Sequence, residues 1–424
     1  MSGGKIHFIL AIFIIALFFF SCFSQSSGIT QKNSSMISKN LISEEINDSD
    51  FDEQMKYIRR VSHFPSLTVC TIKNDTMDWA NSYGFSNVYS LRKSTINTVY
   101  RIGSNTKCIT ATAIMQLYEK GLIGLDDDIN KYLGFEIRNP NYPNDPITIR
   151  MLLSHQSSIY DYFIHDPNGT SEVQKFFPFP EDAGEWIKSI LIPGGELYLD
   201  NYWMDYPPSE HVRYCSIGFI MLGYILEQIT GMDYEDYVME NIFIPLKMHN
   251  SSFYKEDFER NQIAVPYVFY GNKIGVNIPL PHISMNCFNP MSGMFTSIED
   301  LSHFFIAHMN GGVYDGVRIL EESTVEEMHR IQHPDIDEFL WNVNYALGWL
   351  YTDEFICPTQ GHGGIFLGYF SNMMFDSLNN TGIIFIANTN IKSFMESEFD
   401  LTFEWAYREV ANLLLKKANG IYDY

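Results

Sequence analysis

Basic residues are scarce in this chain. Of its 424 residues, 28 are lysine or arginine and 51 are aspartate or glutamate, which gives a formal net charge of −23. Such an excess of negative charge repels the phosphate backbone of nucleic acids and the surface of anionic membranes. We therefore expect no nucleic-acid partner. Hydrophobic residues still make up 46% of the sequence, which allows a substantial buried core and excludes global disorder.

The sequence also lacks the common metal-binding patterns. It has six cysteines and twelve histidines, but neither a Cys-x-x-Cys pair nor a His-Glu-x-x-His segment. We therefore expect no metal and no organic cofactor. Five cysteines follow Cys22, and this odd number leaves at least one free thiol per chain unless one pairs with another molecule.

An apolar run of 13 residues, Phe8–Phe20, lies near the N-terminus. This length is short for a membrane span and typical of a secretory signal. We predict that residues 1–24 are a signal peptide cleaved after Ser24, with a lipid anchor on Cys22 or an uncleaved membrane anchor as alternatives. The polar residues 25–53 are predicted to be a flexible tether. The expected location is secreted, or membrane-tethered on the extracytoplasmic side.

The order of predicted elements indicates the fold class. A helix and two strands come first, helices dominate the middle, and several strands between residues 346 and 389 precede a last helix at 399–417. This order predicts an α+β fold, in which both ends of the chain form an antiparallel sheet flanked by helices and the middle forms a mostly helical lobe. We predict one domain over residues 54–417, followed by a tail at 418–424.

The segment YRIGSNTKCITATAIMQLYEKG, residues 100–121, begins an amphipathic helix that is expected to end near Gly121. Ser104 and Lys107 are three residues apart and would share one helix face. A serine hydroxyl needs a nearby base to act as a nucleophile, and a buried lysine can be that base because burial disfavours its charged form. The structural alternative is that Ser104 caps the helix. Ser-x-x-Lys occurs four times in the chain, so the pattern alone does not decide.

Two later segments carry groups that such a pair needs. Tyr214 precedes a second amphipathic helix in RYCSIGFIMLGYILEQITG, and His362-Gly363-Gly364 enters a strand in GHGGIFLGYF. With these three motifs in this order, the chain resembles the superfamily of serine β-lactamases and penicillin-binding proteins, in particular its class C-like and esterase-like branch. The resemblance spans about residues 54 to 415.

The resemblance implies a role for each motif residue. Ser104 would be the acylated nucleophile and Lys107 its proton partner. Tyr214 would move the proton between nucleophile, leaving group and water, as a phenol or a phenolate. His362 takes the place of the lysine in the family's third motif. The backbone N–H groups of Ser104 and Ile365 would form the oxyanion hole.

Three positions that the resemblance places against the substrate are Ser216, Gly363 and Gly364. Ser216 replaces the asparagine of the family's Tyr-x-Asn motif, and it could instead cap the following helix. Gly363 lacks the hydroxyl of the Lys-Thr-Gly motif, while Gly364 would let the substrate approach the strand closely. Because the asparagine and the hydroxyl contact the substrate in β-lactamases, we do not expect antibiotic hydrolysis.

The predicted function is that of a serine hydrolase that forms an acyl-enzyme on Ser104 and cleaves an ester or amide, such as a small peptide. Two alternatives remain: a D-stereospecific peptidase or carboxypeptidase acting on cell-wall-like peptides, and a catalytically inactive binding protein. The expected partners are a small-molecule or peptide substrate, with a possible membrane tether through the N-terminus. His155 is expected to be structural, and Cys108 and Cys215 to be small core residues. The aromatic-rich residues 160–206 could line an acyl pocket or pack as a lid.

Overall fold

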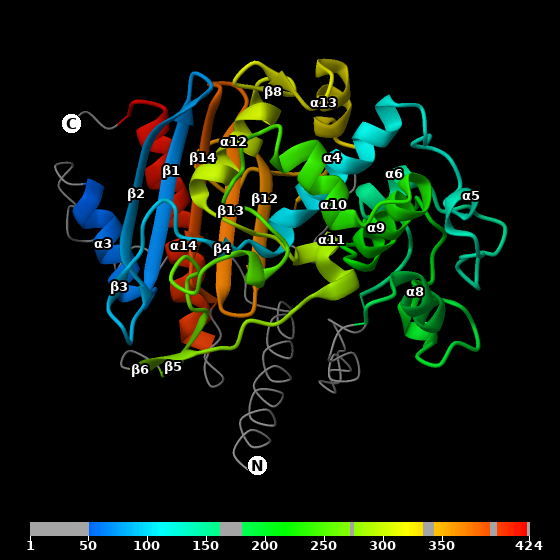
Figure 1. The fold of residues 1–424 in the computed structure, drawn as a ribbon, viewed down its shortest axis with the longest axis horizontal. Helices are drawn as coiled ribbons and strands as arrows, with labels where there is room; N and C mark the ends of the chain where they lie inside the picture. Colours follow the sequence, from blue (N-terminus) through cyan, green and yellow to red (C-terminus); the bar gives the residue numbers. More distant parts are fainter. Residues whose placement is uncertain (1–50, 162–179, 272–274, 334–342, 391–396, 422–424) are drawn as a thin grey trace, which may run out of the picture.

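One large antiparallel sheet organises the protein (Figure 1). The computed structural model describes residues 51–161, 180–271, 275–333, 343–390 and 397–421. The sheet has eight strands in the order β10-β11-β12-β13-β14-β1-β2-β3. Its longer strands are β1 (Ser66–Lys73), β2 (Thr76–Asn87), β12 (Thr359–Phe366), β13 (Tyr369–Asp376) and β14 (Thr381–Ala387).

Strands from the two ends of the chain lie side by side in this sheet. β1 pairs antiparallel with β14, with Val69 opposite Phe385 and Cys70 opposite Ile384. Both strands are buried along nearly their whole length because packed layers cover both faces of the sheet. The predicted α+β fold, with an antiparallel sheet built from both ends of the chain, is confirmed.

Alternate residues of β1 face two different hydrophobic cores, because successive side chains of a strand point to opposite faces. Leu67 belongs to the core that the sheet shares with helices α3 (Phe51–Val61) and α14 (Ser397–Ala418). Cys70 belongs to the larger core on the other face, to which α12 (Ile298–Met309) contributes. The sheet is therefore the middle of three layers.

The middle of the chain forms a helical lobe beside the sheet (Figure 1). Its central helix is α9 (Ile217–Thr230), whose sequence IGFIMLGYILEQIT is apolar on almost every side. A helix of this kind must be surrounded by protein, and α4, α5, α6, α8 and α11 pack around α9. The other helices of the chain's middle are α4 (Thr106–Glu119), α5 (Asn130–Leu133), α6 (Ile149–Leu153), α8 (Ala183–Leu191), α10 (Tyr234–Val238), α11 (Asn289–Ser292) and α13 (Glu322–His329).

Short elements complete the fold. Three small sheets have the strand orders β15-β5-β6, β4-β7 and β8-β9. The short strands are β3 (Arg92–Lys93), β4 (Tyr100–Arg101), β5 (Tyr267–Gly271), β6 (Gly275–Pro279), β7 (Phe295–Thr296), β8 (Val313–Tyr314), β9 (Val317–Arg318), β10 (Asn344–Tyr345), β11 (Leu350–Thr352) and β15 (Thr389–Asn390).

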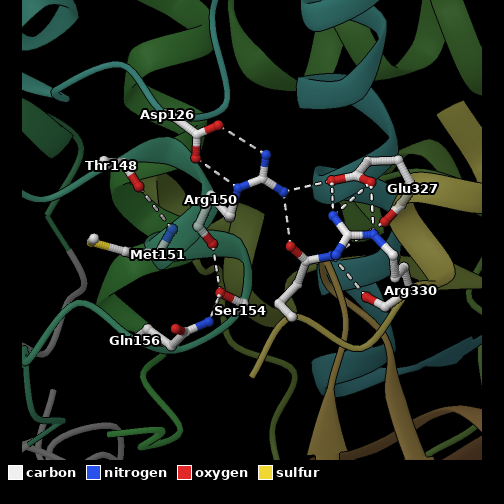
Figure 2. Close-up of polar contacts among 9 residues, drawn as sticks. Asp126, Thr148, Arg150, Met151, Ser154, Gln156, Glu327 and Arg330 are labelled. Carbon is white, nitrogen blue, oxygen red and sulfur yellow. Dashed lines mark hydrogen bonds and ion pairs between the residues drawn. The ribbon is translucent and has the colours of Figure 1, made fainter. Parts of the chain in front are cut away.

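An ion-pair network fixes α6 of the lobe against α13 (Figure 2). The Arg150 guanidinium donates to both Asp126 carboxylate oxygens, at 2.7 and 3.0 Å. It also donates to Glu327 at 2.5 Å and to Gln332 at 2.8 Å. Partly exposed ion pairs contribute about 0–1 kcal/mol each, so the main effect of the network is geometric. It fixes the start of the loop that continues to His155.

The boundaries of the predicted domain need a small correction at each end. α3 begins at Phe51, three residues before the predicted start of the domain at residue 54. Phe51 is buried and packs edge-on against Trp79 with ring centroids 5.1 Å apart, which draws the first turn into the core. At the other end, α14 extends through Ala418, the first residue of the predicted tail.

Several predicted segments lie outside the described residues. These are the signal or anchor at 1–24, the tether up to residue 50, residues 162–179 of the aromatic-rich segment, and the last three residues of the tail. Within the described ranges, no helix is both long enough and apolar enough to cross a membrane.

Candidate active site

Ser104 lies in a tight turn between strand β4 and helix α4. Gly103, with φ +55°, opens one turn of 3-10 helix, η1 (Gly103–Asn105), and α4 continues directly from it. Neither the residue before η1 nor the residue before α4 makes a side-chain cap, and the Ser104 hydroxyl instead contacts the Lys107 amine. The structural alternative, in which Ser104 caps the helix, is therefore wrong.

The Lys107 amine is held against the Ser104 hydroxyl in a buried position. Its Nζ lies 3.1 Å from Ser104 Oγ and donates to the Met291 carbonyl oxygen at 2.9 Å. It also lies 5.0 Å from the centre of the Tyr214 ring and 5.6 Å from that of Phe219. The Lys107 side chain is fully buried, and this burial lowers its pKa to about 7. A neutral amine is therefore abundant at neutral pH.

Tyr214 lies three residues before the start of α9, and its phenol faces the Ser104 hydroxyl. Desolvation raises the pKa of Tyr214 well above its usual value, while a hydrogen bond with Ser104 acts in the opposite direction. The Tyr214 side chain is thus a protonated phenol at neutral pH. The His155 ring packs beside it, with centroids 4.5 Å apart.

The sequence indicated that His362 lies at the entrance of a strand. In the structure it lies inside β12, which begins three residues earlier at Thr359. Its ring centroid is 6.3 Å from that of Tyr214. Nδ1 lies 2.5 Å from the Gly363 carbonyl oxygen, which can only accept, so Nδ1 carries the proton. Burial lowers the pKa of His362 to about 3, so the ring is neutral. Its buried Nε2 has no hydrogen-bond partner among the described residues and is available as an acceptor.

Two glycines bring β12 against the Ser104 turn. A Cβ atom on Gly103 would lie 2.7 Å from the Ile365 carbonyl oxygen and 2.9 Å from the Ile365 nitrogen. A Cβ atom on Gly364 would lie 1.9 Å from the Ile102 carbonyl oxygen. Only a residue without a side chain permits such an approach. It brings the Ile365 backbone beside that of Ser104, the two residues expected to form the oxyanion hole.

The two glycines of the third motif differ in their surroundings. Gly364 is buried against Ile102, so its lack of a side chain permits the close packing of β12 on the Ser104 turn. Gly363 is partly exposed, and a Cβ atom there would meet only Asn372 Nδ2, at 3.9 Å. A small side chain at position 363 would therefore fit without displacing backbone.

Ser216 occupies the position before α9 but makes no side-chain cap. Asp161 accepts hydrogen bonds from the backbone N–H groups of Ser216 and Ile217, at 2.5 and 3.0 Å. The predicted capping role of Ser216 is therefore wrong, because the Asp161 carboxylate, from a distant loop, already binds the N–H groups at the start of α9. Ser216 is buried near Tyr214, and a hydrogen bond between the two lowers the pKa of Tyr214.

Three residues near the site were missed or given a lesser role from the sequence: Asp161, Met291 and His155. Asp161 and Met291 contribute a capping carboxylate and a carbonyl acceptor, for which no local pattern exists. His155 was expected to be structural, and its Nδ1 does accept from the Cys215 N–H at 3.0 Å. In the sequence, the only sign of a special role for His155 is its position two residues after a short predicted helix. The structure adds that His155 has a left-handed backbone, with φ +61°.

The remaining expectations concern thiols and metals. Cys108 and Cys215 are buried core residues, as predicted. All five cysteines in the described part of the chain are free. Across the same residues, no group of three or more histidine, cysteine, aspartate or glutamate side chains is placed to hold a metal ion.

Comparison with known proteins gives the class. The Beta-lactamase family model matches residues 49–404, and the chain belongs to this family of β-lactamase-fold serine hydrolases. The resemblance inferred from three short motifs is thereby confirmed. Protein flp of Staphylococcus aureus is 27% identical over 348 residues, which cover 81% of this chain and 64% of that protein. The chain thus spans less than two thirds of that relative.

Two solved structures illustrate the likeness of fold. The octameric penicillin-binding protein homologue from Pyrococcus abyssi has a TM-score of 0.64 at 24% identity, covering 87% of this chain and 78% of that one. The D-amino acid amidase from Ochrobactrum anthropi has a TM-score of 0.64 at 20% identity, covering 86% and 100%. At these identities the likeness concerns the fold.

Proposed function

We propose that the protein is a serine hydrolase that forms an acyl-enzyme on Ser104 and cleaves an ester or amide. The observation that carries the proposal is the 3.1 Å distance between Lys107 Nζ and Ser104 Oγ, in a place where burial lowers the lysine pKa to about 7. At pH 7 about half of such amines are neutral, against roughly one in three thousand for an ordinary lysine. The pair thus has both a nucleophile and a working base.

Acylation follows from these contacts. Neutral Lys107 takes the Ser104 proton while Oγ bonds to the substrate carbonyl carbon, and the carbonyl electrons move to its oxygen. The N–H groups of Ser104 and Ile365 are the donors for that oxyanion. When the intermediate collapses, the bond to the leaving group breaks, and the Tyr214 phenol protonates that group. The proton held by Lys107 then restores the phenol. Water repeats the sequence on the acyl-enzyme and releases the acid.

The electrostatics of His362 bear on the substrate class. A lysine at this point of the family's third motif supplies a positive charge, whereas His362 is neutral because burial lowers its pKa to about 3. A substrate with a terminal carboxylate would find no charge on this residue to pair with. We therefore favour esters and amides without such a carboxylate, including small blocked peptides, over a carboxypeptidase activity on cell-wall-like peptides.

The test uses purified protein, a fluorophosphonate probe and a short-chain chromogenic ester. We expect labelling and turnover in the wild type and loss of both in Ser104→Ala. Ser90→Ala, in a second Ser-x-x-Lys pattern, is the matched control and should keep both. Turnover that survives in Ser104→Ala would refute the site. Well-folded wild-type protein with neither labelling nor turnover would favour the inactive binding protein.

A further inference from the structure

Asp161 is an acidic side chain placed deep inside the lobe. It is 0% exposed, and its carboxylate accepts from Ser216 N at 2.5 Å and from Ile217 N at 3.0 Å. The Cys215 thiol lies 3.4 Å from the same carboxylate. All three contacts are to the residues that directly follow Tyr214. Burying a carboxylate costs free energy unless hydrogen bonds compensate for the lost water. The two backbone N–H groups provide that compensation for Asp161.

The loop that carries Asp161 fixes the start of α9 at consecutive positions. His155 Nδ1 accepts from Cys215 N at 3.0 Å, and Asp161 accepts from the next two amides. Each N–H from residue 215 to residue 217 is therefore bound by a side chain of the 155–161 loop. Such N–H groups at a helix start otherwise have no partner within the helix. Because Tyr214 is covalently joined to this clamped segment, the loop determines where its phenol lies.

The charge of Asp161 also acts on the base. Asp161 opposes the desolvation that lowers the Lys107 pKa, and it is the largest of the opposing influences. Without that charge, burial would lower the pKa of Lys107 further. The other titratable groups that act on Lys107 or lie beside it are Cys108, His155, Tyr214, Cys215 and His362.

We propose that Asp161 is a positioning residue of the hydrolase, which fixes Tyr214 through the first turn of α9 and acts electrostatically on the Lys107 amine. The inference rests on the proposed function for its effect on turnover. It adds a residue that lies outside the three motifs. Asp161 itself does not touch the reacting atoms, because its oxygens are occupied by the amides of α9.

The variant Asp161→Asn tests both effects. It keeps the volume and one acceptor oxygen, but it removes the charge and turns an NH₂ group toward one of the two amides. We expect kcat for the chromogenic ester to fall by about tenfold to a hundredfold, the scale on which a misplacement of about 1 Å acts. The acid limb of the kcat/KM profile should shift to lower pH, because the Lys107 amine then loses its proton more easily.

Asp300→Asn is the matched control. Asp300 is also buried, 3% exposed, and accepts from Asn250 N and Ser251 Oγ at 2.6 and 2.9 Å. Its replacement removes a buried carboxylate of the same kind without touching α9. It should lower the melting temperature and leave the acid limb in place. A purely structural role for Asp161 would produce the same result in both variants.

A second measurement does not depend on turnover. In protein labelled with ¹³C at lysine Cε, the Lys107 signal, assigned with Lys107→Arg, should titrate near pH 7 in the wild type and at lower pH in Asp161→Asn. An unchanged or higher midpoint in a folded Asp161→Asn protein would overturn the proposal. If the wild type neither labels nor turns over, the hydrolase function fails, and this titration still decides the role of Asp161.

Discussion

Replacing Gly364 by alanine tests how closely β12 must approach the Ser104 turn. The added Cβ atom would lie 1.9 Å from the Ile102 carbonyl oxygen and 2.7 Å from Ser371 Oγ. The backbone oxygen cannot rotate away, so β12 and the turn would have to separate by at least about 1.5 Å to restore an ordinary contact. Overpacking of this kind costs about 1–3 kcal/mol or more. Since the next residue, Ile365, supplies one oxyanion donor, a shift of that size should also lower kcat by about a hundredfold.

Gly363→Ala is the matched control, because the Cβ atom there would meet only Asn372 Nδ2, at 3.9 Å. Urea denaturation should give a lower free energy of unfolding for Gly364→Ala and a change within about 0.5 kcal/mol for Gly363→Ala. Ester turnover, measured on the same preparations, should fall sharply in Gly364→Ala. Equal stability of the two variants would show that the close approach of β12 is not required, and the assignment of the Ile365 donor would fall with it.

Two further predictions concern pH. If neutral Lys107 is the base, kcat/KM should rise with pH up to about 7 and then level off. The variant Lys107→Met should lower the activity by at least a hundredfold. A rate that does not change between pH 5 and 8 would contradict the role of Lys107 as the base. His308 is buried and His329 is half-buried, with 3.3 Å between His308 Nδ1 and His329 Nε2. Desolvation lowers the pKa of His329 to about 4 and that of His308 well below its usual value, so both rings are neutral. Below about pH 6.5 these rings bind protons in the unfolded chain but stay neutral in the folded protein. The free energy of unfolding should therefore fall by about 1.4 kcal/mol per pH unit for each ring as the pH drops toward 4. In His329→Gln, the loss between pH 6.5 and 5 should be about 2 kcal/mol smaller, and urea denaturation at the two pH values checks it.

Features that depend on local pattern could be predicted from the sequence. The periodicity of FDEQMKYIRRV predicts α3, and the turn at 73–75 between two apolar segments predicts β1 and β2. The spacing of Ser104 and Lys107 predicts their contact, because residues three apart in a helix share a face. Strand periodicity would also have predicted that Gly363 and Gly364 face opposite sides, had the motif been placed inside the strand.

Features set by contacts between distant segments could not be predicted. Asp161 caps a helix that begins 56 residues later, and no local rule connects the two positions. The interpretations in which Ser104 and Ser216 cap the helices that follow them were wrong because contacts with other side chains decide both positions. A serine before a helix is a common cap, but at Ser104 the Lys107 amine engages the hydroxyl, and at Ser216 the amides are already occupied.

The pairing of β1 with β14 has a consequence for how the protein is made. Ser66, at the start of β1, donates from its backbone N–H to Asn388 Oδ1 at 2.8 Å, across 322 residues of sequence. During synthesis β1 therefore leaves the ribosome long before β14 has been made, and its edge stays unpaired in the meantime. We expect slow closure of the sheet after release, because pairings between segments distant in sequence form slowly. Ser104 emerges early and β12 emerges late, so the contact between the Ser104 turn and β12 forms only near the end of synthesis.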